Sequence, residues 1–260
     1  MRVGFKFIVL IVLSLAPFLV RAGDFSYSVA PVWWQYKESA VKTPTIPDSP
    51  LNSSAQGYDV GLGIDYLYDL NPAWHIKTTW KGLLPLTQGS ERWNLASGLQ
   101  VNQLQIFQSE LRVDVTKEIS DVELSFWGSY FWHNQLRKNF VKNGVKLNSP
   151  SISETIQVVW MGLGLDAMSD HDLMNLHLEA AIPTWVHTTN SSVKGVFSKR
   201  TGFRAEASAS FLLPWSLAGA DMHVESSYEY RKLGGELLSG VALWPENRWQ
   251  SISLGVNAKW

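Results

Sequence analysis

Apolar and polar residues alternate along most of this chain. The clearest stretch is 58–68, in which Tyr, Val, Leu and Ile at the even positions alternate mostly with Asp and Gly at the odd positions. A period of two is typical of a β-strand with one apolar and one polar face. The same pattern recurs at 24–36, 74–82, 93–115, 122–132, 159–165, 174–182, 203–213, 220–231 and 250–260, so we predict ten strands.

Short and long connections follow one another between these strands. Short turns lie near residues 70, 119, 170 and 215, and long polar stretches lie near 45, 90, 145, 193 and 240. Transmembrane barrels show this rhythm, with short periplasmic turns and long outer loops. We therefore predict an all-β fold, a transmembrane antiparallel up-and-down β-barrel of about ten strands, with eight or twelve strands as alternatives. A soluble β-sandwich is the rival architecture.

The predicted strand from Trp93 to Val115 is longer than the others. Its odd positions stay mostly apolar over a length about twice that of a bilayer-spanning strand. Either it projects beyond the membrane, or its first part, residues 93–105, is a loop. We favour a projecting hairpin arm that pairs with part of the following strand.

The N-terminus has the composition of a secretory signal. A basic start precedes an apolar run from Phe7 to Val20 and a small residue at Ala22, so we expect residues 1–22 to be cleaved and residues 23–260 to form the barrel. Cleavage removes three of the 22 Lys and Arg residues and leaves 19 against 23 Asp and Glu, a net charge of −4. That balance argues against a nucleic-acid partner. Without cysteine, disulfides and thiolate metal sites are excluded.

Aromatic residues are abundant, with 13 Trp, 8 Tyr and 11 Phe, and those on the apolar faces gather near strand ends. Such girdles anchor a protein at the two lipid–water boundaries. The chain ends on a strand, and the order Ser253-x-Gly255-x-x-Ala258-x-Trp260 resembles the terminal signal that Gram-negative outer-membrane barrels present to their assembly machinery. It departs from that signal at Ala258, where a larger apolar residue is usual. The resemblance implies that Gly255 and Trp260 serve in anchoring and assembly.

The polar faces of the strands carry many charges, which a barrel would enclose. A ten-stranded barrel is close to the size that side chains fill, so these charges must pair with one another or hold water. One hypothesis is that these charges form a salt-bridged plug. The other is that they line a narrow conduit for a small polar solute. The predicted lumenal set is Asp59, Asp65, Lys77, Glu110, Arg112, Asp114, Glu123, Glu179, Arg204, Glu206, Asp221, His223, Glu225 and Lys259.

Two short patterns are candidates for catalysis. His187 and Thr189, in His187-Thr-Thr-Asn190, resemble the His-x-Ser-Asn pattern of outer-membrane phospholipase and lipid A deacylases, although Thr stands in place of Ser and His187 falls on the lumenal parity. The triplet Asp221-x-His223-x-Glu225 contains the Asp/His pair type of the ten-stranded omptin proteases, but it lies at the periplasmic end of its predicted strand. We expect no metal site and no cofactor.

The sequence indicates location better than activity. We expect a Gram-negative outer-membrane protein, exported through a cleaved signal, that is a non-enzymatic narrow pore or a structural envelope protein with a largely plugged lumen. The alternatives are a hydrolase of lipid or peptide at the extracellular rim and a loop-based receptor or adhesin. The expected partners are outer-membrane lipid, lipopolysaccharide and the barrel assembly machinery. The oligomeric state stays open.

Overall fold

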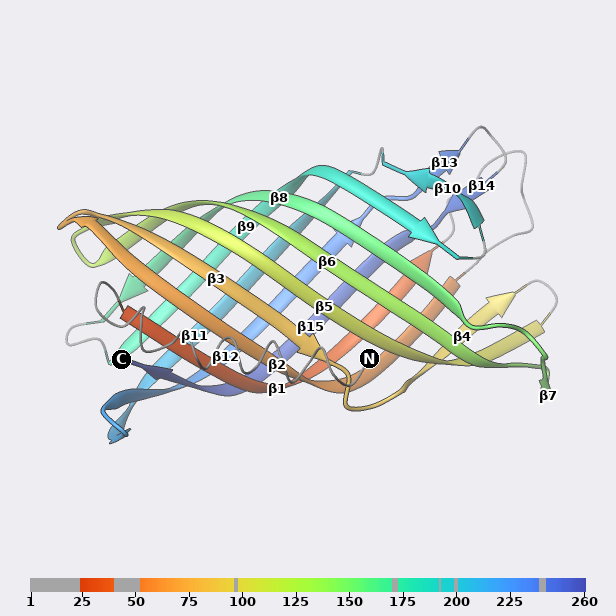
Figure 1. Cartoon of the computed structure of the whole chain (residues 1–260), viewed down its shortest axis with the longest axis horizontal. Helices are drawn as coiled ribbons and strands as arrows, with labels where there is room; N and C mark the ends of the chain where they lie inside the picture. Colours follow the sequence, from red (N-terminus) through yellow and green to blue (C-terminus); the bar gives the residue numbers. More distant parts are fainter. Residues whose placement is uncertain are drawn as a thin grey trace, which may run out of the picture.

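The computed structural model describes residues 24–39, 52–95, 98–169, 173–191, 193–198, 201–238 and 242–260, and these are almost entirely β-strand (Figure 1). The expected signal peptide lies outside the described residues. The strands are β1 (Asp24–Ser39), β2 (Asn52–Asn71), β3 (Trp74–Leu84), β4 (Gly89–Leu95), β5 (Gly98–Ile119), β6 (Val122–Lys142), β7 (Val145–Lys146), β8 (Ile152–Met168), β9 (Met174–Asn190), β10 (Val193–Phe197), β11 (Gly202–Leu217), β12 (Ala220–Leu233), β13 (Glu236–Leu238), β14 (Ala242–Trp244) and β15 (Glu246–Lys259).

Antiparallel pairing closes these strands into a ring. Each long strand pairs with its neighbours in the chain, and the first strand β1 pairs with the last strand β15 along twelve residue pairs. Strands β3 and β4 occupy the same position around the ring, one after the other along the barrel, because each pairs with both β2 and β5. The ring therefore has ten places, and the predicted ten-stranded antiparallel barrel is confirmed.

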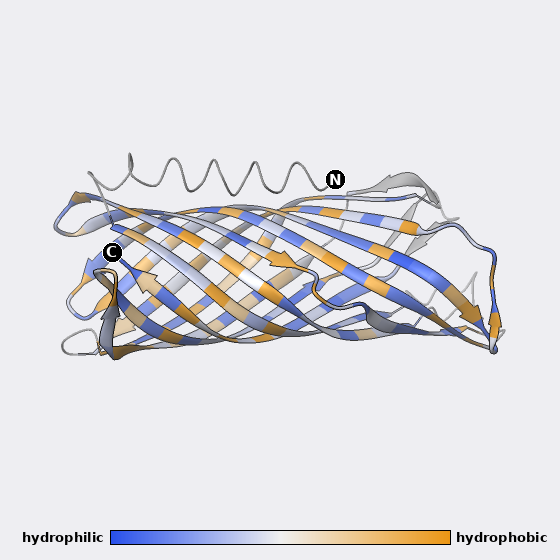
Figure 2. Ribbon diagram, turned by 60° about the horizontal axis from the view of Figure 1, so that its bottom comes forward, coloured by the Kyte–Doolittle hydropathy of each residue, from blue (hydrophilic) through white to orange (hydrophobic). Residues whose placement is uncertain are grey.

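Hydrophobic alternation gives the barrel two different surfaces (Figure 2). Exposed apolar side chains form a belt on the outside, and aromatic residues mark both of its edges. Near the short turns the belt ends at Tyr68, Trp74 and Trp260, and toward the other end it reaches Tyr58, Tyr130, Trp185, Phe203 and Tyr228. An apolar band between two aromatic girdles is typical of a barrel that crosses a membrane. None of the described residues forms a helix long and apolar enough to cross a membrane.

The ring continues well past the second girdle. Strands β5 and β6 are 22 and 21 residues long, about twice the length that a bilayer requires. They pair with each other from Gln100 to Ile119, so the projecting arm predicted for this stretch is present. In Figure 1, β4, β7, β10, β13 and β14 lie at this projecting end, and the short turns lie at the opposite end with the C-terminus.

Three sequence-based boundaries are wrong. The predicted single strand 93–115 is divided between two antiparallel strands, because β4 ends at Leu95 and β5 begins at Gly98. Trp93 therefore belongs to β4. The long polar stretch predicted near residue 90 contains most of β4, and much of the stretch predicted near residue 145 is the end of β6, β7 and the start of β8. Beyond the girdle the outside of the barrel faces water, so the outward residues become polar and the apolar signal disappears although the strand goes on.

Candidate functional site

Inside the belt, ion pairs across the lumen join five strands, with β3 and β5 on one side and β9, β11 and β12 on the other. We call this group the central cluster: Lys81, Glu110, Arg112, Asp114, Glu179, Arg204, Glu206, Glu229 and Arg231. Arg204 on β11 is 2% exposed, and its guanidinium lies 2.6 Å from Glu110, 3.0 Å from Glu206 and 2.9 Å from Glu229. Arg112 on β5 holds Glu179 and Asp114 in further ion pairs. Alternation places all these side chains inward. Register sets Lys81 opposite Glu110 on one side, and Glu206 opposite Glu179 and Glu229 on the other.

A layer of aromatic rings packs against the central cluster. We call Trp34, Trp127, Trp160 and Trp249 the tryptophan layer, and all four are buried. The guanidinium of Arg112 lies 4.1 Å from the centre of the Trp127 ring, and that of Arg231 lies 5.1 Å from the centre of Trp249. Trp34 stacks on Trp249 with ring centres 5.5 Å apart and donates its Nε1 hydrogen to Asp59 at 2.7 Å. Cations over aromatic faces are stabilised most where water is absent.

Beyond the girdle a second group of charges lies inside the projecting part of the barrel. We call it the outer cluster: Glu38 on β1, Glu91 on β4, Arg137 on β6 and Glu154 on β8. Arg137 is 2% exposed and lies 2.9 Å from Glu38, 2.8 Å from Glu91 and 2.9 Å from Glu154. On β6, Arg137 comes seven residues after Tyr130 of the second girdle, which is about 23 Å along the strand. The outer cluster is therefore outside the apolar belt.

Polar side chains complete the outer cluster. Ser53 donates to Glu38 at 3.1 Å or to Glu91 at 3.2 Å, and Tyr36 donates to Glu38 at 2.6 Å. Burial raises the pKa of the Tyr36 hydroxyl well above its usual value, and the Glu38 carboxylate raises it further. Burial alone would also raise the pKa of Glu91, but the Arg137 charge and its hydrogen bonds lower it below the usual range. One guanidinium thus pairs with three enclosed carboxylates.

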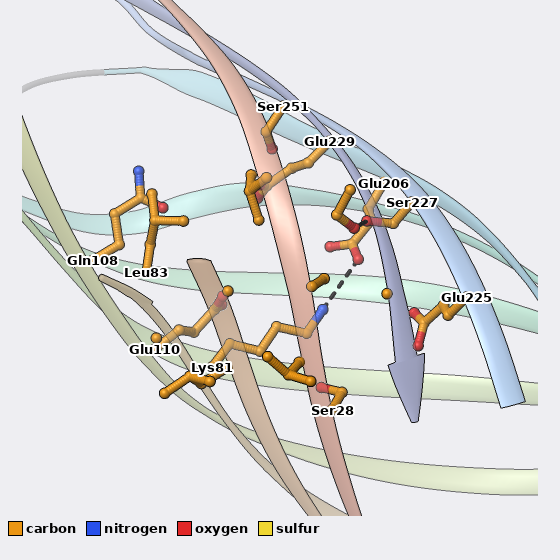
Figure 3. A pocket seen from close by; sticks show the side chains of 18 of the residues that line it. Ser28, Lys81, Leu83, Gln108, Glu110, Glu206, Glu225, Ser227, Glu229 and Ser251 are labelled. Atoms are coloured by element: carbon orange, nitrogen blue, oxygen red, sulfur yellow. Dashed lines mark hydrogen bonds and ion pairs between the residues drawn. The ribbon is translucent and has the colours of Figure 1, made fainter. Parts of the chain in front are cut away.

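A cavity of about 160 Å³ lies beside the central cluster. Small residues of β1, β2, β12 and β15 form one wall, including Ser28, Ala30, Gly61, Ser227, Ser253 and Gly255, while Phe131 and Trp249 border it toward the outer cluster. Figure 3 shows Lys81 extended toward Glu206, with the carboxylate of Glu225 nearby. Lys81 is 46% exposed, so water reaches this chamber.

The structure places most residues of the predicted lumenal set inside the ring. Glu110, Arg112, Asp114, Glu179, Arg204 and Glu206 meet in the central cluster. Nearer the short turns, Lys77 lies 3.8 Å from Asp65 and is half exposed. Glu123, His223 and Glu225 are partly exposed on the inward faces of β6 and β12. Asp221 and Lys259 face each other in register at the strand ends, where both are exposed to solvent.

The inward assignment of His187 is also wrong. The β8–β9 register shifts between Val159 and Trp160, opposite Trp185 and Pro183, and the extra residue inverts the alternation of β9. Val186 and Thr188 are buried inside, whereas His187 and Thr189 face outward. His187 stacks on the Trp185 ring with centres 5.7 Å apart, and no hydrogen bond joins it to Thr189 in the described part of the chain. The geometry does not show an activated hydroxyl.

Histidines and carboxylates otherwise form pairs. His177 lies 2.9 Å from Asp166 and 3.2 Å from Glu179, and His75 lies 2.6 Å from Asp69. Among the described residues, no group of three His, Asp or Glu side chains is arranged to hold a metal ion.

Both residues of the predicted terminal signal lie at the seam between β1 and β15. Gly255 is buried, and a Cβ atom there would come within 2.4 Å of the Ala30 Cβ. Only glycine allows β1 and β15 to approach with this packing. The Trp260 amide donates to the carbonyl of Phe25 at 2.9 Å, and its ring meets Tyr27 edge-on at 5.7 Å. The last residue is therefore fixed at the girdle.

Comparison with solved structures identifies the type of barrel. The outer-membrane protease OmpT from Escherichia coli matches with a TM-score of 0.57 and 10% identity, over 92% of this chain and 97% of that chain. The outer-membrane protein OprG from Pseudomonas aeruginosa gives a TM-score of 0.39 with 11% identity over 92% and 96% of the two chains. The chain has the fold of a Gram-negative outer-membrane β-barrel. No protein-family model and no curated protein sequence matches it.

An identity near 10% shows the fold alone. The outer-membrane barrel has charged residues that the sequence did not single out, namely Glu38, Glu91, Arg137 and Glu154 of the outer cluster. Their signal was present, because the inward odd positions of β6 continue from Phe131 through His133 and Gln135 to Arg137. That four separate strands bring these residues together depends on register, which alternation does not reveal.

Deletion of Trp260 is expected to reduce the yield of this outer-membrane barrel much more than Trp260→Phe does. Deletion removes the amide bond to Phe25 and the ring at the girdle, whereas Phe keeps both an amide and an aromatic ring. The measurement is the amount of folded, heat-modifiable protein in outer-membrane fractions. Equal yields for the deletion and the wild type would show that the terminal ring is dispensable.

Proposed function

We propose that the protein is a non-conducting outer-membrane barrel that acts through the part projecting beyond the bilayer. Short turns face the periplasm in such barrels, so the outer cluster and the strands around it lie on the extracellular side. One observation carries the proposal: buried side chains of the central cluster, the tryptophan layer and the outer cluster occupy much of the interior. A pore would need a continuous path of solvated charges past these groups.

Burial values support a closed interior. Arg112, Arg137, Arg204 and Arg231 are 6%, 2%, 2% and 6% exposed, and each contacts at least one carboxylate. Charges that lined a water path would be far more exposed. The cavity of about 160 Å³ reaches Phe131 and Trp249 but includes none of the outer cluster. It is a water-accessible chamber beside the central cluster.

Export and assembly belong to the same proposal. A cleaved signal at residues 1–22 would deliver the chain to the periplasm, and the terminal strand with Gly255 and Trp260 would be recognised by the barrel assembly machinery. Lipid and lipopolysaccharide would then surround the apolar belt.

Ion conduction tests the proposal directly. Purified protein incorporated into planar bilayers in concentrated KCl should give no steady current steps. The double variant Trp34→Gly with Trp249→Gly removes two stacked rings and should open a measurable leak, which shows that the silence of the wild type reflects closure rather than failed insertion. Reproducible ohmic steps from the wild type would refute the closed barrel and favour the narrow pore.

A further inference from the structure

Three cations form a row across the outer surface of β12, β15 and β1. Lys232 lies directly opposite Arg248 in the β12–β15 register, and Arg248 lies directly opposite Lys37 in the β1–β15 register. Adjacent strands are about 4.8 Å apart, so the row is about 10 Å wide. We call these residues the cationic row. Like charges placed directly opposite repel one another, so packing within the sheet does not explain the arrangement.

The same three strands carry a graded surface below the cationic row. Trp33, Ile252 and Tyr228 are paired in register on the outer face, four residues nearer the belt. Between the two rows come Gln35, Gln250 and Tyr230, again in register. Four residues span about 13 Å along a strand. This surface therefore changes from apolar to uncharged polar to cationic over the thickness of a lipid headgroup region.

One carboxylate neutralises the cationic row only in part. Glu246 lies 3.0 Å from Lys232 and 2.7 Å from Arg248, and Lys37 has no ion pair among the described residues. Three positive charges and one negative charge leave a net charge of +2 on an exposed surface. Lys37 and Arg248 remain open to solvent, so an anion from outside can reach both.

We propose that the cationic row binds a phosphate group of a phosphorylated glycolipid in the outer leaflet. This inference rests on the orientation in the proposed function, which puts the cationic row just above the extracellular girdle. The charges match a phosphate, and Arg248 can offer two parallel N–H donors to its oxygens. The apolar row below, with Ile252 and Tyr228 about half exposed, receives the acyl chains of the same molecule. A free phosphate ion would use the cations but not the apolar row.

Binding in detergent tests the site without depending on orientation. Purified protein in a maltoside detergent is mixed with diphosphorylated lipid A, with the same lipid after phosphatase treatment, and with inorganic phosphate, and complexes are counted by native mass spectrometry. The double variant Lys37→Gln with Arg248→Gln should bind diphosphorylated lipid A about tenfold more weakly. Glu246→Gln removes the competing carboxylate and should bind it several-fold more tightly. Lys146→Gln, an exposed cation on β7 far from the row, is the matched control and should bind as the wild type does.

Each outcome decides the inference. Opposite shifts in the double variant and in Glu246→Gln, seen with the phosphorylated lipid and absent with the dephosphorylated one, support a phosphate site. Unchanged affinity in the double variant, or equal losses for both lipids, overturns it. Inorganic phosphate that competes at the same concentration as the lipid would show a general anion site and also overturn the assignment. A conducting wild-type protein would refute the closed barrel while leaving this measurement unaffected.

Discussion

Replacement of Arg204 by Met is expected to destabilise the barrel by about 3–5 kcal/mol, the cost of removing one partner from a buried ion pair. The guanidinium is 2% exposed and lies within 3.6 Å of four carboxylates, those of Glu110, Glu179, Glu206 and Glu229. Without it these carboxylates repel one another in a space that water hardly reaches. Urea-induced unfolding of protein reconstituted in lipid, followed by heat-modifiability on gels, measures the change.

Two further variants separate charge from geometry at this position. Arg204→Lys keeps the charge but loses the planar fork that contacts several carboxylates at once, so it should be intermediate. Lys81→Met is the matched control, because Lys81 has one ion-pair partner, Glu206, and is 46% exposed. Its effect should be much smaller. Equal losses for Arg204→Met and Lys81→Met would mean that the central cluster is solvated, as in a conduit.

Replacement of Arg137 by Met is expected to reverse the pH dependence that the outer cluster contributes to stability. In the wild type the pKa of Glu91 is lowered on folding, so its contribution is present at neutral pH and is lost as the pH falls below about 4. Without Arg137, burial and mutual repulsion raise the carboxyl pKa values on folding. The stability contributed by each neutral carboxyl is then present at low pH and is lost as the pH rises.

The Arg137→Met variant should therefore be less stable than the wild type by about 3–5 kcal/mol at pH 7, and this deficit should shrink toward pH 5. Unfolding midpoints in urea at several pH values measure both quantities. Lys138→Met is the matched control, since Lys138 is the next residue and points away from the outer cluster. A constant deficit from pH 7 to pH 5 would show that the three glutamates do not depend on Arg137.

Alternation was sufficient to predict the faces of the strands within the belt. Asp59 and Asp65 on β2, or Arg204 and Glu206 on β11, could be assigned inward because lipid outside and charge inside give opposite signals at adjacent positions. The contrast weakens beyond the girdle. There Gln35 and Gln56 face outward while Trp34 and Leu104 are buried inside, so hydropathy alone ends the strands too early.

The site was less predictable than the fold. One extra residue near Pro183 and Trp185 inverted the assignment of His187, and no hydropathy pattern marks such a bulge. Glu38, Glu91, Arg137 and Glu154 are distant in sequence and meet only because β1, β4, β6 and β8 surround a narrow interior. Each glutamate could be read as a surface residue of a loop. Strand register decides that each glutamate meets Arg137 inside the barrel and is buried there.

The wall of small residues has a consequence for biogenesis. The first and last strands can join only after the rest of the chain has been inserted, and their shared border inside the belt carries Ser28, Ala30, Ser253 and Gly255 on the lumenal side. Along these four residues no bulky side chain has to interdigitate as the border forms, whereas farther out Trp34 and Trp249 stack across it. Large side chains from β5, β6, β9 and β11 can settle against one another beforehand, and main-chain hydrogen bonds complete the circle. At this stretch of the joint, closure of the nascent barrel therefore depends mainly on main-chain hydrogen bonds between the first and last strands.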